Sequence, residues 1–170
     1  MGRAEQLSWQ SSGRKGKKEI VSQYEHWLQG MVISVPHSGT RSVKALTGLT
    51  TQWHWGENED RILKYDGLAH IPIRHPVDIQ LSWLARYSNE ADFLKQQEKT
   101  AVGLVPDLLQ RQLDWIKGRG NVVLHKIEDL HIHEGKGPDK DRRGFMCTDQ
   151  VVATKRWMLK NMDFYGQFYG

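Results

Sequence analysis

The sequence predicts an α/β fold, in which a parallel sheet lies between helices on both of its faces as a three-layer arrangement. Two segments, residues 31–49 and 69–87, each run from an apolar strand through a tight turn into a helix. Further strand-like and helix-like segments alternate along the chain, and this alternation is typical of parallel sheets with helical crossovers. Ligands of such sheets bind at the carboxyl ends of strands, so we expect both turns to contribute to one site.

Apolar spacing and turn residues predict the elements in order. Strands are expected over residues 31–35, 51–55, 69–74 and 122–125. Helices are expected over residues 20–28, 40–49, 60–65, 76–87, 90–100, 105–117 and 148–162. Pro76 and Pro106 suit the first turns of their helices, and Gly118 ends the helix that Pro106 begins. We expect residues 19–170 to form one domain.

Charge and composition exclude several classes of protein. Residues 1–18 carry the whole net charge of +4, because the rest of the chain has equal numbers of basic and acidic residues. This polar segment is expected to be a disordered basic tail, and a nucleic-acid partner is not expected for the neutral remainder. Cys147 is the only cysteine, so an internal disulfide is excluded. No apolar run is long enough for a membrane span, and we expect a cytoplasmic protein.

The turn after the first strand has the composition of an anion site. Gly39 allows the backbone to approach a phosphate closely. The hydroxyl groups of Ser38, Thr40 and Ser42 would add donors to the unpaired N–H groups at the start of the helix. A Walker A loop is excluded, because the turn has one glycine and no following lysine. An ordinary strand–turn–helix junction is the alternative.

The second strand–turn–helix segment places an arginine and a serine on two elements. Arg74 ends the strand, and Ser82 lies eight residues later, about two turns into the helix. Side chains placed in this way would hold one phosphate from two sides. The alternative is a helix start at which Arg74 only pairs with Asp78.

These two segments resemble the nucleotide-binding motifs of sulfotransferases that use 3′-phosphoadenosine-5′-phosphosulfate (PAPS). The turn Pro36–Thr40 is similar to their 5′-phosphosulfate loop. Their 3′-phosphate motif, an Arg-x-Pro-x-Asp sequence followed by a serine, is matched by Arg74, Pro76, Asp78 and Ser82. The resemblance implies a P-loop-like fold, PAPS as the co-substrate without a metal, and transfer to a hydroxyl or amine of a small-molecule or glycan-like acceptor.

Weaker similarities extend the resemblance over roughly residues 31–170. Residues 121–130, a strand followed by Glu-Asp-Leu, resemble a late strand of the family, with Ile127 in place of an aromatic residue. Residues 157–169 resemble the closing helix. The basic loop 135–144 is similar to the family loop that covers the nucleotide, so Arg142 and Arg143 would bind the 3′-phosphate. A plain charged surface loop is the alternative.

The chemistry of sulfuryl transfer requires a cation at the leaving phosphate and a base at the acceptor. His37 occupies the position where the family has a lysine or arginine, and Arg41 is the alternative cation. The resemblance places the base between the two motifs, where His54 is the first candidate and Glu57 the second. The other candidates there are Glu59, Asp60 and His70.

Other functions remain open on the sequence alone. His131 and His133 alternate with apolar residues, but no third ligand follows at a suitable spacing, so no metal site is expected. Because the loop lysine is missing, a catalytically weak nucleotide-binding protein of the same fold is the main alternative. An ATP-dependent phosphotransferase is a second alternative, although no Walker lysine is present. The oligomeric state is not predicted.

Overall fold

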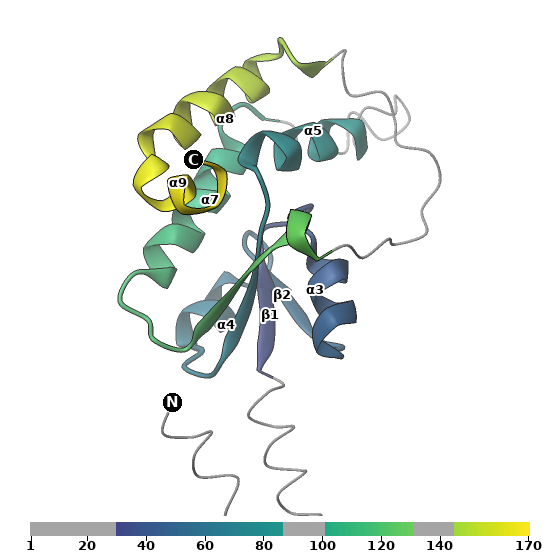
Figure 1. The fold of residues 1–170 in the computed structure, drawn as a ribbon, viewed down its shortest axis with the longest axis vertical. Helices are drawn as coiled ribbons and strands as arrows, with labels where there is room; N and C mark the ends of the chain where they lie inside the picture. The colour runs from purple at the N-terminus through teal and green to yellow at the C-terminus, as the bar shows by residue number, and fades with distance from the viewer. Residues whose placement is uncertain (1–29, 87–100, 131–144) are drawn as a thin grey trace, which may run out of the picture.

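The computed structural model describes residues 30–86, 101–130 and 145–170, which build an α/β unit on a four-stranded parallel sheet (Figure 1). The strand order is β2-β1-β3-β4. This confirms the coarse α/β prediction. The strands are β1 (Met31–Ser34), β2 (Gln52–His54), β3 (Ala69–Ile73) and β4 (Val122–Lys126).

Each strand lies within about one residue of its predicted ends. β1 stops at Ser34 because the carbonyl of Val35 accepts a turn hydrogen bond from the Ser38 N–H at 3.2 Å. β1 pairs with β2 and β3, with Val32 opposite both Gln52 and His70. β4 pairs with β3 along its whole length and runs one residue further than predicted.

The helices also follow the predicted order. They are α3 (Thr40–Thr47), α4 (Glu59–Lys64), α5 (Pro76–Arg86), α7 (Leu104–Ile116), α8 (Asp149–Lys160) and α9 (Met162–Tyr169), with a short 3₁₀ helix η2 (Ile127–Asp129) after β4. α3 is two residues shorter than predicted, because Gly48 adopts a left-handed conformation and its N–H caps the carbonyl of Lys44.

The end of the last predicted helix is wrong. The predicted helix over 148–162 stops at Lys160, and α9 follows as a separate helix. The backbone leaves the helical conformation at Asn161, whose side-chain amide donates to the carbonyl of Trp157 at 2.8 Å. The chain therefore turns at Asn161 and brings α9 back toward the sheet (Figure 1).

Alternate residues of β1 pack against different helices. Ile33 belongs to a buried cluster that includes Leu108 and Leu109 of α7, whereas Val32 packs with Val43 of α3. Because successive side chains of a strand point to opposite faces, α3 and α7 contact opposite faces of the sheet. The remaining helices of the larger cluster contribute Ile62, Ile79, Trp83, Met158 and Tyr165.

Several predictions lie outside the described residues. They are the basic tail 1–18, the helices over 20–28 and 90–100, and the loop 135–144. Within the three described ranges, no helix has both the length and the apolar character that a membrane span requires.

Candidate functional site

The topology places a potential ligand site at the carboxyl ends of β1 and β3. These two strands are neighbours in the sheet. The chain leaves β1 through α3, which packs on one face, and leaves β3 through α5 and α7, which join the core on the other face. Neighbouring strands whose crossovers lie on opposite faces create a crevice at their carboxyl ends, where α/β proteins bind ligands.

The two predicted phosphate motifs meet in this crevice. The Arg74 guanidinium donates from Nη1 to the backbone carbonyl of His37 at 2.9 Å. The Ser82 hydroxyl lies 3.3 Å from Nδ1 of the His37 ring. That ring also packs at a tilt against the indole of Trp83, with 5.2 Å between centroids. The structure thus brings together three residues that the sequence predicted for one site.

His37 holds its position with an uncommon backbone conformation. Its φ is 69°, and it is the only non-glycine residue in the described ranges with a positive φ. A non-glycine residue in this region is strained and persists only where its surroundings hold it. Here the contacts with Arg74, Ser82 and Trp83 do so.

The hydroxyl groups of the loop stabilise the loop itself. Ser38 is 1% exposed, and its hydroxyl donates to the carbonyl of Val35 at 2.6 Å. The hydroxyl groups of Ser34 and Thr40 form a buried hydrogen bond of 2.8 Å. Ser42 is buried as well, whereas Arg41 is exposed. In this structure Arg41 therefore presents its charge to solvent, and the hydroxyls of Ser38 and Thr40 bind within the loop.

Gly39 is required by the close approach of the segment that follows β4. It caps the N-terminus of α3 with a φ of 104°. A Cβ atom at this position would lie 2.5 Å from the side chain of Ile127 in η2. The third segment of the sequence resemblance, with Ile127 at the family's aromatic position, therefore contacts the loop directly.

Sequence reasoning missed a polar cluster beside this crevice. The Tyr169 hydroxyl donates to the carboxylate of Glu128, with distances of 2.9 and 3.2 Å to its two oxygens. The ring of Tyr169 packs edge-on against His75, and the Lys126 ammonium lies 5.2 Å from its centroid. Burial, and then the Glu128 carboxylate, raises the pKa of Tyr169. A tyrosine in an aromatic C-terminal run carries no local signal for such a partner.

The first candidate base lies at its predicted strand end but is covered. His54 ends β2 opposite Ser34. Its Nε2 is buried and has no hydrogen-bond partner in the described part of the chain. Burial lowers the pKa of His54, the charge of Glu57 raises it, and Lys44 lowers it further. His54 is therefore neutral at pH 7, and in this structure its Nε2 does not reach solvent.

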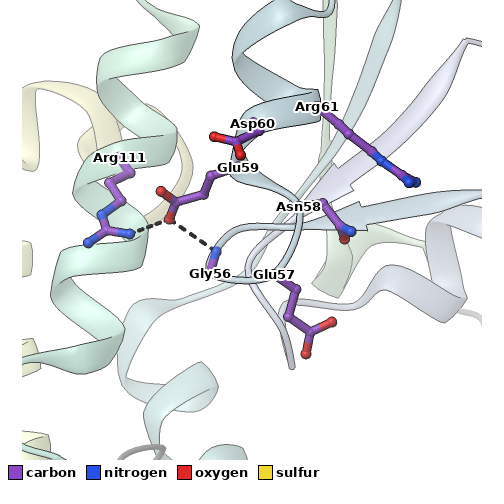
Figure 2. A pocket seen from close by; sticks show the side chains of 7 residues that line it. All are labelled: Gly56, Glu57, Asn58, Glu59, Asp60, Arg61 and Arg111. Carbon is purple, nitrogen blue, oxygen red and sulfur yellow. Dashed lines mark hydrogen bonds and ion pairs between the residues drawn. The ribbon is translucent and has the colours of Figure 1, made fainter.

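The second candidate base, Glu57, lines a separate open cavity of about 460 Å³. Figure 2 shows the pairing of Glu59 with the Arg111 guanidinium, while the Glu57 side chain points away from that pair. Glu59 also accepts from the Gly56 N–H at 3.2 Å. The lining residues are Gly56, Glu57, Asn58, Glu59, Asp60, Arg61 and Arg111. Neither the loop at 36–42 nor Arg74 contributes to this cavity.

Another candidate base, His70 of β3, pairs with His125 of the neighbouring strand β4. Its Nδ1 lies 2.9 Å from Nε2 of His125, and the two rings stack with centroids 5.2 Å apart. Burial, together with the charge of His70, lowers the pKa of His125. This pair joins β3 to β4 below the crevice, on the face that carries α3.

Comparisons of the chain with protein-family models, with curated proteins and with solved structures give no match. A functional assignment therefore depends on the residues themselves. Of the predicted site residues, Arg142 and Arg143 lie outside the described ranges. His131 and His133, for which no metal site was expected, lie outside them as well. The others are all placed, and they divide into those at the β1–β3 crevice, those near the end of β2, and His70, which pairs with His125.

Proposed function

We propose that the protein is a sulfotransferase on a three-layer, P-loop-like fold, which transfers a sulfuryl group from PAPS to a hydroxyl or amine of a small-molecule or glycan-like acceptor. One observation carries the proposal. Arg74 and Ser82, predicted to bind the 3′-phosphate, both contact His37 in the predicted 5′-phosphosulfate loop. Two phosphate-binding segments that touch each other suit a ligand with phosphates at both ends of one ribose.

The roles of the residues follow from this arrangement. The backbone N–H groups at the start of α3 and the Arg41 guanidinium bind the 5′-phosphosulfate. Arg74 and Ser82 exchange their contacts with His37 for contacts with the oxygens of the 3′-phosphate. Arg142 and Arg143 remain proposed ligands of that phosphate.

The transfer step forms one bond and breaks one. The acceptor oxygen or nitrogen attacks the sulfur, and the bond from sulfur to the 5′-phosphate oxygen breaks. The leaving phosphate takes that electron pair, and a protonated His37 stabilises the charge. The acceptor proton goes to a base, for which His54 and then Glu57 remain the candidates. The products are the sulfated acceptor and 3′-phosphoadenosine-5′-phosphate.

A second candidate function is nucleotide binding without efficient transfer. The positions of both candidate bases favour this alternative. His54 Nε2 is buried, and Glu57 lines a cavity to which the loop at 36–42 does not contribute. The replacement of the family lysine by His37 points the same way. An ATP-dependent phosphotransferase is the remaining alternative.

The experiment is calorimetry with 3′-phosphoadenosine-5′-phosphate and with ATP, on the wild type and Arg74→Ala. We expect the wild type to bind the first nucleotide more tightly. Arg74→Ala should weaken its binding about ten- to a hundredfold, because a charge-assisted phosphate contact contributes roughly 1.5–3 kcal/mol.

Arg86→Ala is the matched control, since Arg86 is an exposed arginine at the C-terminal end of α5, the helix that follows Arg74. The affinity of this variant should equal that of the wild type. Preference for ATP, or equal affinities for Arg74→Ala and Arg86→Ala, would contradict the assignment. Transfer from radiolabelled PAPS to model hydroxyl and amine acceptors then separates the enzyme from the non-catalytic binding protein.

A further inference from the structure

The end of α9 lies against the carboxyl ends of β3 and β4. The Tyr169 hydroxyl lies 2.9 Å from Oε2 of Glu128 and 3.4 Å from the backbone carbonyl of Ile73, the last residue of β3. Because the pKa of Tyr169 is raised, the phenol keeps its proton at physiological pH and acts as a donor to the carboxylate. The α9 helix is thereby fixed to the edge of the sheet at which the two phosphate motifs meet.

Glu128 also contacts His75, the residue that follows Arg74. Its Oε1 accepts a hydrogen bond from the backbone N–H of His75 at 3.3 Å. The His75 ring packs against Tyr169, and its Nδ1 accepts from the Val77 N–H at 3.2 Å, which caps the start of α5. Tyr169, Glu128 and His75 thus form one connected set, and a single peptide bond separates it from Arg74.

The carboxylate of Glu128 is an exposed negative charge beside the proposed phosphate site. Two donors, the Tyr169 hydroxyl and the His75 N–H, fix its orientation. An exposed glutamate that loses a donor regains rotamer freedom. The His75 N–H holds this carboxylate one residue from Arg74. A released carboxylate would therefore pair with the Arg74 guanidinium and compete with the phosphate for that cation.

We propose that Tyr169 and Glu128 are positioning residues for recognition of a nucleotide 3′-phosphate and act through Arg74. Tyr169 holds the Glu128 carboxylate on the His75 backbone, so that this carboxylate does not compete with the phosphate for the Arg74 guanidinium. This inference rests on the proposed function. It adds a residue pair outside the two phosphate motifs, because Glu128 and Tyr169 lie in the two segments that resemble the family more weakly.

The test compares two nucleotides that differ only near this cluster. 3′-Phosphoadenosine-5′-phosphosulfate has the 3′-phosphate, and adenosine 5′-phosphosulfate lacks it. Tyr169→Phe should weaken binding of the first about three- to tenfold, the range for one lost hydrogen bond, and change binding of the second less than about twofold. Merely structural damage would weaken both ligands alike.

A double-variant cycle identifies the released carboxylate as the cause. Glu128→Gln removes the competing charge and keeps an oxygen that accepts from Tyr169. We expect Glu128→Gln alone to bind PAPS at least as tightly as the wild type, and Tyr169→Phe in the Glu128→Gln background to cause no further loss. Tyr165→Phe, the same substitution in the same helix at a residue of the buried core, is the control and should leave both affinities unchanged.

The outcomes separate the two proposals. If the wild type binds no 3′-phosphoadenosine nucleotide, the proposed function fails and this inference fails with it. If the wild type binds PAPS but Tyr169→Phe matches Tyr165→Phe, the proposed function stands and the positioning role is wrong. A full loss that persists in the Glu128→Gln background would also overturn it, because the defect would then not come from the carboxylate.

Discussion

The β1–α3 and β3–α5 junctions have the same order of strand, tight turn and helix, yet they present different chemical groups. The β1–α3 junction is built on Gly39, and its hydroxyl groups bind inward to the loop. The β3–α5 junction is built on His75 and Pro76, and it directs Arg74 and Ser82 toward the first junction. One junction presents its backbone, and the other presents its side chains.

The difference indicates how each junction responds to substitution. The β1–α3 junction depends on the left-handed backbone of Gly39. We therefore expect a single added methyl group to disturb both the stability of the fold and the ligand site. A junction that works through side chains tolerates their truncation with little loss of stability, and its variants change ligand affinity instead. The two kinds of response are separable by measuring unfolding free energy beside nucleotide affinity.

The largest expected effect is that of Gly39→Ala. The added Cβ would lie 2.5 Å from Ile127 at a φ of 104°, so left-handed strain and overpacking act together. We expect a loss of about 3 kcal/mol in the free energy of unfolding, measured by urea denaturation.

Gly48→Ala, at the other end of α3, is the matched control. Its φ of 75° is also left-handed, but no atom lies within 4 Å of the added Cβ. We expect a loss of about 1 kcal/mol, from backbone strain alone. If the two variants were equally stable, contact with Ile127 would not be what requires glycine at position 39.

A smaller effect is expected at the second junction. His75→Ala removes the side-chain acceptor of the Val77 N–H, and loss of such a helix cap costs about 1 kcal/mol. His75→Asn replaces the imidazole with a favoured capping side chain, so its unfolding free energy should lie close to that of the wild type. If the Asn variant lost as much as the Ala variant, the ring contact with Tyr169 would matter more than the cap.

The smallest effect is a pH dependence of the unfolding free energy, which comes from the pair of His70 and His125 between β3 and β4. His125 has a lowered pKa in the folded protein because it is buried beside His70. The folded state therefore binds fewer protons than the unfolded state just below about pH 6.5, and stability falls as the pH falls through that range.

His125→Gln should flatten this dependence. The measurement is the urea midpoint of the wild type and the variant at about pH 7.5 and about pH 5.5, on either side of the model histidine pKa. An identical decline in both proteins would show that other groups, such as His54, control the acid sensitivity.

Much of the fold could be predicted because its signals are local. Short stretches of sequence were enough to predict these elements: the apolar runs at 31–35 and 69–74, and the prolines at 76 and 106. The placement of both turns at one edge followed from one general rule, that parallel strands direct their following turns to the same edge. Sequence reasoning anticipated this shared edge, but not the direct contact of Arg74 with the His37 carbonyl.

The rest depended on contacts between distant residues. Neither glycine nor proline marks the helix break at Asn161, and the helical pattern continues through it. The pairing of Tyr169 with Glu128 spans 41 positions and exists only because that break returns α9 to the sheet. The burial of His54 Nε2 likewise depends on how the chain packs around the end of β2, which no local pattern specifies.

The left-handed backbone of His37 limits which side chains this position accepts without added strain. Residues with a branched Cβ are strongly disfavoured at a φ of 69°, whereas glycine, asparagine, aspartate and histidine are tolerated. A substitution at position 37 therefore changes the conformational preference of the backbone as well as the charge of the side chain. Histidine is the member of that small set that also supplies a proton near neutral pH.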